Sequence, residues 1–294
     1  MDEGHNGMTE TPMHIVLGGV RGSRPVSHPD FMRFGGATTS VLIDNGAGAR
    51  IVIDAGTGLQ TLQPHLSVPD ASLPVLLLFT HYHLDHLIGL PPFAPLYDPA
   101  HRFVFAAPPR HGTTVRQALD RLTAPPFWPV AFRAGQQFLD LPATCEAPYR
   151  HGPFDVRWCA VHHENGCHAY RIDDRATGAS VVFATDLEWR LSDEAERKDF
   201  LRLCREPRPL DLLIMEGHYD SEAREGWGHS RWQDAAEVAR QVCARHLVVT
   251  HLAPEADDLT LEAREHRLQA LCPHARLGRQ GLSILWQRGD AGNV

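Results

Sequence analysis

The chain lacks the long apolar segment that a membrane protein needs. Its longest apolar stretch, from about Leu73 to Phe79, is far shorter than the roughly 20 residues that cross a bilayer as a helix. The first residues, MDEGHNGMTETPMH, are polar and acidic, so they do not resemble the apolar core of a signal peptide. These features predict a cytoplasmic protein with no membrane partner.

Cysteine and positive charge are also in short supply. The six cysteines include no C-x-x-C pair, which predicts free thiols in a reducing compartment rather than disulfides or a cysteine zinc site. The 28 Lys and Arg are outnumbered by 36 Asp and Glu, for a net charge of −8. Because clustered basic side chains provide affinity for nucleic-acid backbones, this balance disfavours a bare polyanion as partner. Histidine, with 19 residues, is the conspicuous excess.

Short apolar runs rich in branched and aromatic residues recur along the chain and predict strands. They begin at Ile15, Val41, Ile51, Val75, Phe103, Val181, Leu212, Leu247 and Leu282. Helices are predicted from a cap at Ser192 to about Arg205, after a cap at Ser230, and from Leu259 to Leu271. Because strands and helices alternate and no Gly/Ser-rich linker intervenes, we expect one layered α/β domain at 13–288. A disordered leader at 1–12 and a loose tail at 289–294 would flank it.

A dense group of potential metal ligands follows the apolar run that begins at Val75. His81 and His83 can point the same way, because side chains alternate in an extended segment. A helix predicted from Leu87 would turn Asp85 and His86 toward a second point. Two ligand groups that leave one loop in different directions are what a two-metal site needs.

The H-x-H-x-D-H pattern of this loop resembles the signature of the metallo-β-lactamase superfamily of hydrolases. Other residues match the superfamily's further positions in order, each after an apolar run, so the resemblance spans about residues 14–286. They are Asp54 in IVIDAGTGL, His163 in VHHENGCHAYRI, Asp186 in VVFATDLEW and His251 in LVVTHLAP. The neighbouring His162 is the alternative to His163, whose spacing to the YRI segment fits the superfamily better.

The resemblance implies an αββα sandwich with a dinuclear metal site at one edge between the sheets. His81, His83 and His163 would hold one ion, and Asp85, His86 and His251 the other. Asp186 and a hydroxide would bridge them, while Asp54 would orient a ligand histidine. Asp85, His229 and Asp54 are the residues expected to serve catalysis. A set made only of His and Asp suits two Zn²⁺ ions, and Mn²⁺, Fe²⁺ or Ni²⁺ could also occupy it.

Three features of the sequence favour phosphodiesters over the superfamily's other substrates. The zinc β-lactamases lack a residue equivalent to Asp186. Gly228-His229-Ser230 resembles an element of the ribonuclease Z and cyclic-phosphate phosphodiesterase branch, in which the histidine lies near the scissile phosphate. The alternative is a simple loop histidine before a helix capped by Ser230. The glycine-rich segments at 20–25 and 34–40 resemble the opening of bacterial phosphodiesterase-like members, and a tight turn explains them nearly as well.

Only 22 residues separate His163 from Asp186, too few for the protruding arm with which ribonuclease Z grips tRNA. We therefore expect a small or cyclic phosphodiester as substrate and regard tRNA as disfavoured. The alternative is hydrolysis of a lactone, thioester or other carbonyl ester at the same metals. A third hypothesis, a non-catalytic metal-binding sensor, leaves seven ligands without a purpose. The resemblance also allows a homodimer, although no segment indicates an interface.

Overall fold

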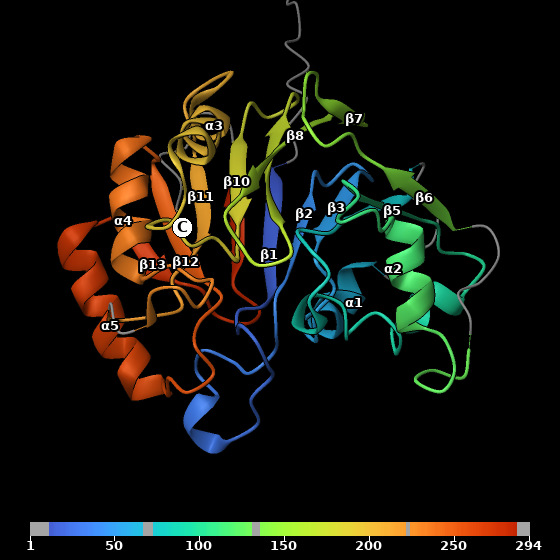
Figure 1. The fold of residues 1–294 in the computed structure, drawn as a ribbon, viewed down its shortest axis with the longest axis horizontal. Helices are drawn as coiled ribbons and strands as arrows, with labels where there is room; N and C mark the ends of the chain where they lie inside the picture. The colour runs from blue at the N-terminus through green and yellow to red at the C-terminus, as the bar shows by residue number, and fades with distance from the viewer. Residues whose placement is uncertain (1–11, 67–72, 131–135, 222–223, 287–294) are drawn as a thin grey trace, which may run out of the picture.

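Two seven-stranded sheets lie face to face, with helices on their outer sides (Figure 1). The computed structural model describes residues 12–66, 73–130, 136–221 and 224–286. The predicted single-domain αββα sandwich is confirmed. The predicted leader, apart from residue 12, and the predicted tail lie outside the described residues, so both remain predictions.

The first sheet has the strand order β14-β1-β2-β3-β4-β5-β6. Its strands are β1 (Met13–Gly19), β2 (Ser40–Asp44), β3 (Arg50–Ile53), β4 (Val75–Leu78), β5 (Phe103–Ala107), β6 (Gln137–Asp140) and β14 (Ser283–Trp286). Neighbours from β3 to β6 are parallel, and the other pairs are antiparallel. Helices α1 (Leu59–Leu66) and α2 (Val115–Leu122) pack on the outer face through their own apolar cluster.

The second sheet repeats this plan in the order β13-β12-β11-β10-β9-β8-β7. Its strands are β7 (Tyr149–His151), β8 (Phe154–Val161), β9 (Cys167–Asp174), β10 (Ser180–Ala184), β11 (Leu212–Glu216), β12 (His246–Thr250) and β13 (Ala275–Leu277). Neighbours from β10 to β13 are parallel and the rest antiparallel. The outer helices are α3 (Glu194–Arg205), α4 (Trp232–Gln241) and α5 (Asp258–Leu271) (Figure 1).

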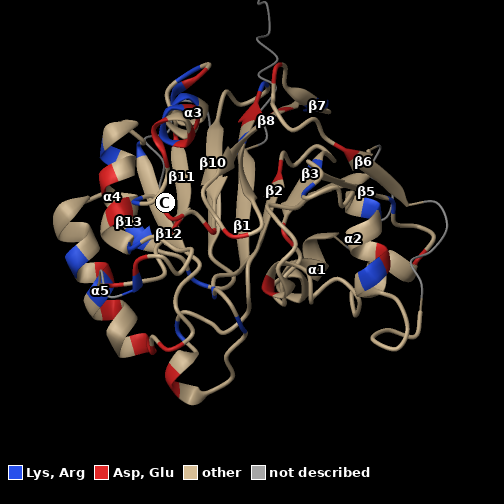
Figure 2. Cartoon of the chain, in the orientation of Figure 1, with Lys and Arg blue, Asp and Glu red and all other residues tan. Residues whose placement is uncertain are grey.

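The main apolar core includes residues from both sheets and from the inner sides of α3, α4 and α5. Trp232, predicted to be a core residue, is buried in it. Charged side chains are most frequent on the outer helices α2 to α5 (Figure 2). Within the described part of the chain, no helix has the length and apolar character needed to cross a membrane.

Several predicted local features differ from the structure. The cap of α3 is Asp193 rather than Ser192, because the Asp193 carboxylate accepts a hydrogen bond from the Glu196 amide. Ser230 caps no helix; its hydroxyl instead contacts the chain at Leu187. The helix predicted from Leu87 is replaced by two short 3₁₀ turns, Leu84–His86 and Ala94–Tyr97. Strands β6 to β9 and β13 were not predicted, because polar residues interrupt their apolar pattern.

A buried arginine, Arg171, is one of the polar residues that interrupt the apolar pattern of β9. The Arg171 side chain is fully buried and pairs with Asp173 at 2.9 Å. It also donates hydrogen bonds to the carbonyls of Leu203 and Cys204 near the end of α3, at 3.1 and 2.7 Å. The guanidinium therefore ties α3 to the sheet and satisfies carbonyls that a helix end leaves without partners.

We expect Arg171→Leu to lower the free energy of unfolding by about 3 kcal/mol, because it removes a fully buried guanidinium from the Asp173 carboxylate and leaves the buried carbonyls of Leu203 and Cys204 without this donor. Urea unfolding followed by circular dichroism measures the loss. Arg157→Leu is the matched control, since Arg157 pairs with the same Asp173 carboxylate but stays 25% exposed, and its loss should be under about 1 kcal/mol. Equal losses in both variants would contradict this role of Arg171.

Candidate metal centre

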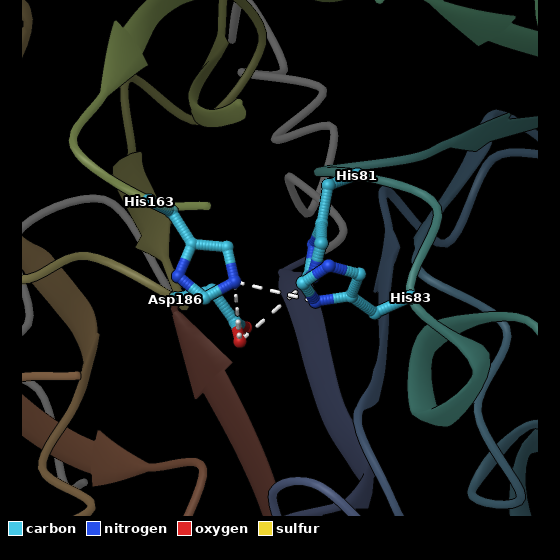
Figure 3. A group of neighbouring side chains, drawn as sticks. All are labelled: His81, His83, His163 and Asp186. Atoms are coloured by element: carbon cyan, nitrogen blue, oxygen red, sulfur yellow. Dashed lines mark hydrogen bonds and ion pairs between the residues drawn. The ribbon is translucent and has the colours of Figure 1, made fainter. Parts of the chain in front are cut away.

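The candidate ligands converge because parallel strands present their carboxyl ends at one edge of each sheet. The histidine-rich loop follows β4, Asp186 follows β10 and His251 follows β12. His163 lies in the turn between β8 and β9. The two sheets therefore contribute ligands from facing sides, as Figure 3 shows for four of them.

The first ligand group consists of His81, His83, His163 and Asp186, whose ligand atoms all lie within 4.8 Å of one another. The Nε2 atom of His163 is 3.3 Å from the Nδ1 atom of His83, and the side chains point toward a common centre (Figure 3). The second group, Asp85, His86 and His251, meets the same distance criterion. The structure thus brings together all seven residues that the sequence analysis proposed as ligands.

The Asp186 carboxylate lies between the two groups. Its Oδ1 atom is 3.8 Å from the Nε2 atom of His81 and 3.6 Å from that of His163. Its Oδ2 atom is 3.1 Å from the Nε2 atom of His86 and 3.3 Å from that of His251. Each oxygen faces a different group, which is the arrangement that a carboxylate bridging two ions requires.

Several buried polar atoms at this point have no hydrogen-bond partner among the described residues. They are the Nε2 atoms of His81 and His86 and the Oδ2 atom of Asp186. A buried polar atom without a partner costs about 1–3 kcal/mol, and a metal ion would supply one. The residues present therefore fit a pair of divalent cations, since imidazole and carboxylate ligands suit zinc and several other transition metals.

The electrostatics of the two groups also suit cations. Burial lowers the pKa of His163 to about 4 and that of His81 well below its usual value, so both imidazoles are neutral, the form that binds metal. Burial alone would lower the pKa of His86, but Asp85, Asp186 and Asp54 raise it well above the usual value. The same carboxylates would stabilise a dication in place of that proton.

Three site residues adopt left-handed backbone conformations that side chains rarely tolerate. The φ angles are +62° at Asp54, +53° at Asp186 and +53° at His251. Each lies just after the strand that positions it, β3, β10 or β12. Such conformations cost of order 1–3 kcal/mol and concentrate at functional sites. The tight turns direct these side chains into the space between the sheets.

Asp54 contacts the candidate ligand His86. Its Oδ2 atom is 2.7 Å from the Nδ1 atom of His86, which leaves the Nε2 atom of His86 directed at Asp186. The Thr80 amide and hydroxyl donate to the two Asp54 oxygens at 2.8 and 2.7 Å. Asp54 thus fixes the orientation of His86 without being placed in either ligand group.

The adjacent histidines His162 and His163 point in different directions. His163 lies in the cluster, and its Nδ1 atom is 2.8 Å from the Gly228 carbonyl. His162 is 42% exposed and pairs with Glu196 on α3 at 3.2 Å. The geometry therefore favours His163 as the ligand, in agreement with the choice made from its spacing.

His229 reaches the site together with two residues that the sequence analysis missed. Its Nδ1 atom is 3.0 Å from the buried Glu216 carboxylate, and its ring stacks on His218 at 4.4 Å. Its ring centre lies 5.5 Å from that of His163 and 5.0 Å from that of His251, so His229 neighbours both ligand groups. Glu216 and His218 directly follow the apolar run of β11, the same signal that revealed the other site residues.

Ligand atoms of His218, His229 and His251 also lie within 4.8 Å of one another. This third set shares His251 with the second group. His229 is therefore placed either to act on a substrate or to bind a metal itself, and metal analysis of a His229 variant separates these roles.

The fold and the ligand groups together define a metal-dependent hydrolase of the metallo-β-lactamase fold. The chain belongs to the family described as the beta-lactamase superfamily domain, which matches residues 49–252. It is also similar to ribonuclease Z from Agathobacter rectalis, at 23% identity over 81% of this chain and 88% of that protein. Similarity to a ribonuclease does not fit well with the expectation from the sequence that tRNA is disfavoured as a substrate.

Two solved structures have the same fold at low identity. The metallo-β-lactamase fold protein YhfI from Bacillus subtilis has a TM-score of 0.69 at 20% identity, over 94% of this chain and 99% of that one. A diphosphatase from the PhnP family has a TM-score of 0.66 at 18% identity, over 94% of this chain and 98% of that one. At these identities the likeness establishes the fold.

We expect the metal-loaded protein to hold about two equivalents of metal and Asp186→Ala to lose at least one, because removing a bridging carboxylate leaves two coordination shells incomplete. Elemental analysis after gel filtration measures the content. Asp155→Ala is the control, since Asp155 is a partly buried carboxylate paired with surface arginines. Full occupancy in Asp186→Ala would remove Asp186 from the centre.

We expect Asp54→Asn to keep most of its metal but to lose activity by roughly 10–100-fold, because residues that orient ligands tune a metal without binding it. Metal content and kcat/KM are measured on the same preparation. Activity equal to that of the unmodified protein would assign Asp54 to fold structure alone.

Proposed function

We propose that the chain is a dinuclear phosphodiesterase that acts on a small or cyclic phosphodiester. Its candidate ligands are histidines and aspartates, which suit two zinc ions. The observation that carries the proposal is the position of His229. Its Nδ1 atom lies 3.0 Å from the Glu216 carboxylate and 3.7 Å from the Asp186 carboxylate. A protonated histidine next to two metal sites suits a reaction in which an anionic transition state expels an alkoxide.

Each part of the site has a role in this proposal. The metals, when bound, supply hydroxide at neutral pH and stabilise charge on the phosphate. The candidate ligands are His81, His83, Asp85, His86, His163, Asp186 and His251. Burial raises the pKa of Glu216, and the charge and hydrogen bond of His229 oppose that rise. Glu216 accepts hydrogen bonds from His229 and the Leu187 amide, and in its carboxylate form it orients His229. His229 then donates a proton or hydrogen bond to the departing oxygen, with Asp54 orienting His86 and Asp85 serving the second metal.

The ribonuclease Z relative supports a second candidate, cleavage of RNA. Against it, the stretch between His163 and Asp186 is filled by β9, its turn and β10, and the chain carries a net charge of −8. A carbonyl ester remains the other alternative. A hydrolysis screen of the metal-loaded protein over bis-aryl phosphodiesters, cyclic nucleotides, a tRNA precursor, lactones and thioesters decides among them. The proposal is contradicted if the protein hydrolyses none of the phosphodiesters in this screen.

The proposal extends to the setting of the enzyme. Six free cysteines support a reducing compartment such as the cytoplasm. The proposed function requires no partner other than the phosphodiester substrate. It is also compatible with a homodimer.

We expect His229→Ala to keep both metals while kcat/KM on phosphodiesters with alkyl leaving groups falls by roughly 10²–10⁴-fold, because such groups need an acid to leave. The loss should shrink for nitrophenyl esters, whose leaving group departs without a proton. The measurement is the ratio of rates for the two proteins across leaving groups of rising pKa. A constant ratio near one would exclude the acid role, and metal loss would instead make His229 a ligand.

A pH profile tests the same pair independently. Burial alone would lower the pKa of His229, but Glu216 raises it to about 9. An acid is present below its pKa, so kcat/KM for alkyl esters should fall as the pH rises through the pKa of His229. In Glu216→Gln the carboxylate is lost, and the fall should move to lower pH while metal content stays the same. Coincident profiles for the two proteins would contradict this role of Glu216.

A further inference from the structure

A cleft of about 860 Å³ opens beside the first ligand group, and His81 and His83 are part of its lining. Ligand pockets in proteins typically measure about 300–1,000 Å³, so this cleft is large enough for a substantial part of a substrate. His81 and His83, two candidate ligands, form one end of the cleft. If a phosphodiester were bound with its phosphate at the metals, one of its ester groups could therefore lie in the cleft.

Apolar side chains form two of the walls of this cleft. One wall comes from the loop after β4 and includes Leu84, Ile88 and Pro91, and the other comes from the end of α2 and the next loop, with Leu122 and Phe127. Leu84 is 65%, Ile88 42% and Phe127 80% exposed. Exposed apolar residues gathered in one concavity indicate a binding surface.

The charge of the cleft is opposite to that of the chain. No Asp or Glu lines it among the described residues, whereas Arg110 and Arg121 both do. Arg110 is fixed in place, since its guanidinium donates to the carbonyls of Pro108 and Gly166 at 3.0 and 3.1 Å. Arg121 is exposed, and no carboxylate among the described residues pairs with it. The cleft therefore combines an apolar surface with a cationic rim, within a chain of net charge −8.

We propose that this cleft binds an apolar ester group, aryl or alkyl, of an anionic phosphodiester, an inference that rests on the proposed function. The apolar walls would exclude water from the hydrocarbon, and Arg121 would attract the anion. Thr113, Asn165 and His111 also line the cleft and could pair with the polar edge of a nucleobase, but apolar side chains outnumber the polar ones beyond the candidate ligands. A nucleobase is therefore the poorer fit. The substrate class is thus a phosphodiester with one bulky apolar group.

Binding without turnover tests the cleft itself. The probe is naphthalene-1-sulfonate, an aryl anion with no hydrolysable ester, titrated calorimetrically into the metal-loaded protein. We expect Phe127→Ala to weaken binding roughly tenfold, because burial of a phenyl ring contributes on this scale. The matched control is Leu259→Ala, a substitution of a 71% exposed residue on α5, outside the cleft, which should leave the Kd unchanged. Absence of binding, or equal effects of the two substitutions, would overturn the proposal.

Kinetics with a common leaving group test how the cleft is used. The p-nitrophenyl diesters of methyl, 1-naphthyl and thymidine 5′-phosphate differ only in the group that stays on the phosphate. We expect the naphthyl ester to have a kcat/KM at least tenfold above that of the methyl ester. Phe127→Ala should remove this preference by lowering the naphthyl rate, whereas the control Leu259→Ala should keep it. A thymidine ester that exceeds the naphthyl ester, with the same Phe127 dependence, would overturn the apolar occupant in favour of a nucleobase.

The two experiments separate this inference from the proposed function. Hydrolysis of phosphodiesters without Phe127-dependent binding of naphthalene-1-sulfonate would overturn the cleft proposal and retain the proposed function. Phe127-dependent binding without hydrolysis of any phosphodiester would overturn the phosphodiester substrate while supporting an apolar anion as the occupant.

Discussion

The arrangement of the site depends on one buried carboxylate, that of Asp186, which both ligand groups contact. Burial alone would raise its pKa, but His251, His86 and His81 hold that pKa well below its usual value. A carboxylate kept ionised at this depth requires positive charge on both sides. His86, whose pKa is raised by the surrounding carboxylates, supplies such charge, and cations held by the two ligand groups would supply it on both sides. The two facing sheets make this possible, because each directs imidazoles toward this one carboxylate.

This requirement also explains why strain is tolerated at the ends of three strands. Asp54, Asp186 and His251 all have left-handed backbone conformations, which only a well-packed surrounding can maintain. The cores on both faces of the sheets supply that packing, with the strands β3, β10 and β12 almost wholly buried. The packing of the strands thus maintains the strained turns that orient these three side chains.

The sequence revealed most of this centre because its chemistry is local. Apolar runs predicted nine strands, and the polar residues after four of them marked six candidate ligands and Asp54. The seventh candidate, His163, follows β8, which was not predicted, and came from the resemblance to the superfamily. What could not be predicted depends on contacts between distant segments. Glu216 follows an apolar run like the other site residues, but its pairing with His229 depends on the place of β11 between β10 and β12. Ser230 contacts Leu187 instead of capping a helix. Likewise, β9 escaped prediction because Arg171 and Asp173 satisfy each other inside the protein.

Reactivity and recognition come from different parts of this molecule. The candidate ligands sit on turns at the ends of buried strands, where small displacements would disturb both ligand groups. The walls of the adjoining cleft come from the loop after β4 and the end of α2, where exposed side chains can change at little cost to the core. A fold likeness below 25% identity therefore establishes the arrangement of the strands but says nothing of the walls. For this reason the cleft, rather than the metal centre, is the part of the structure from which the substrate must be inferred.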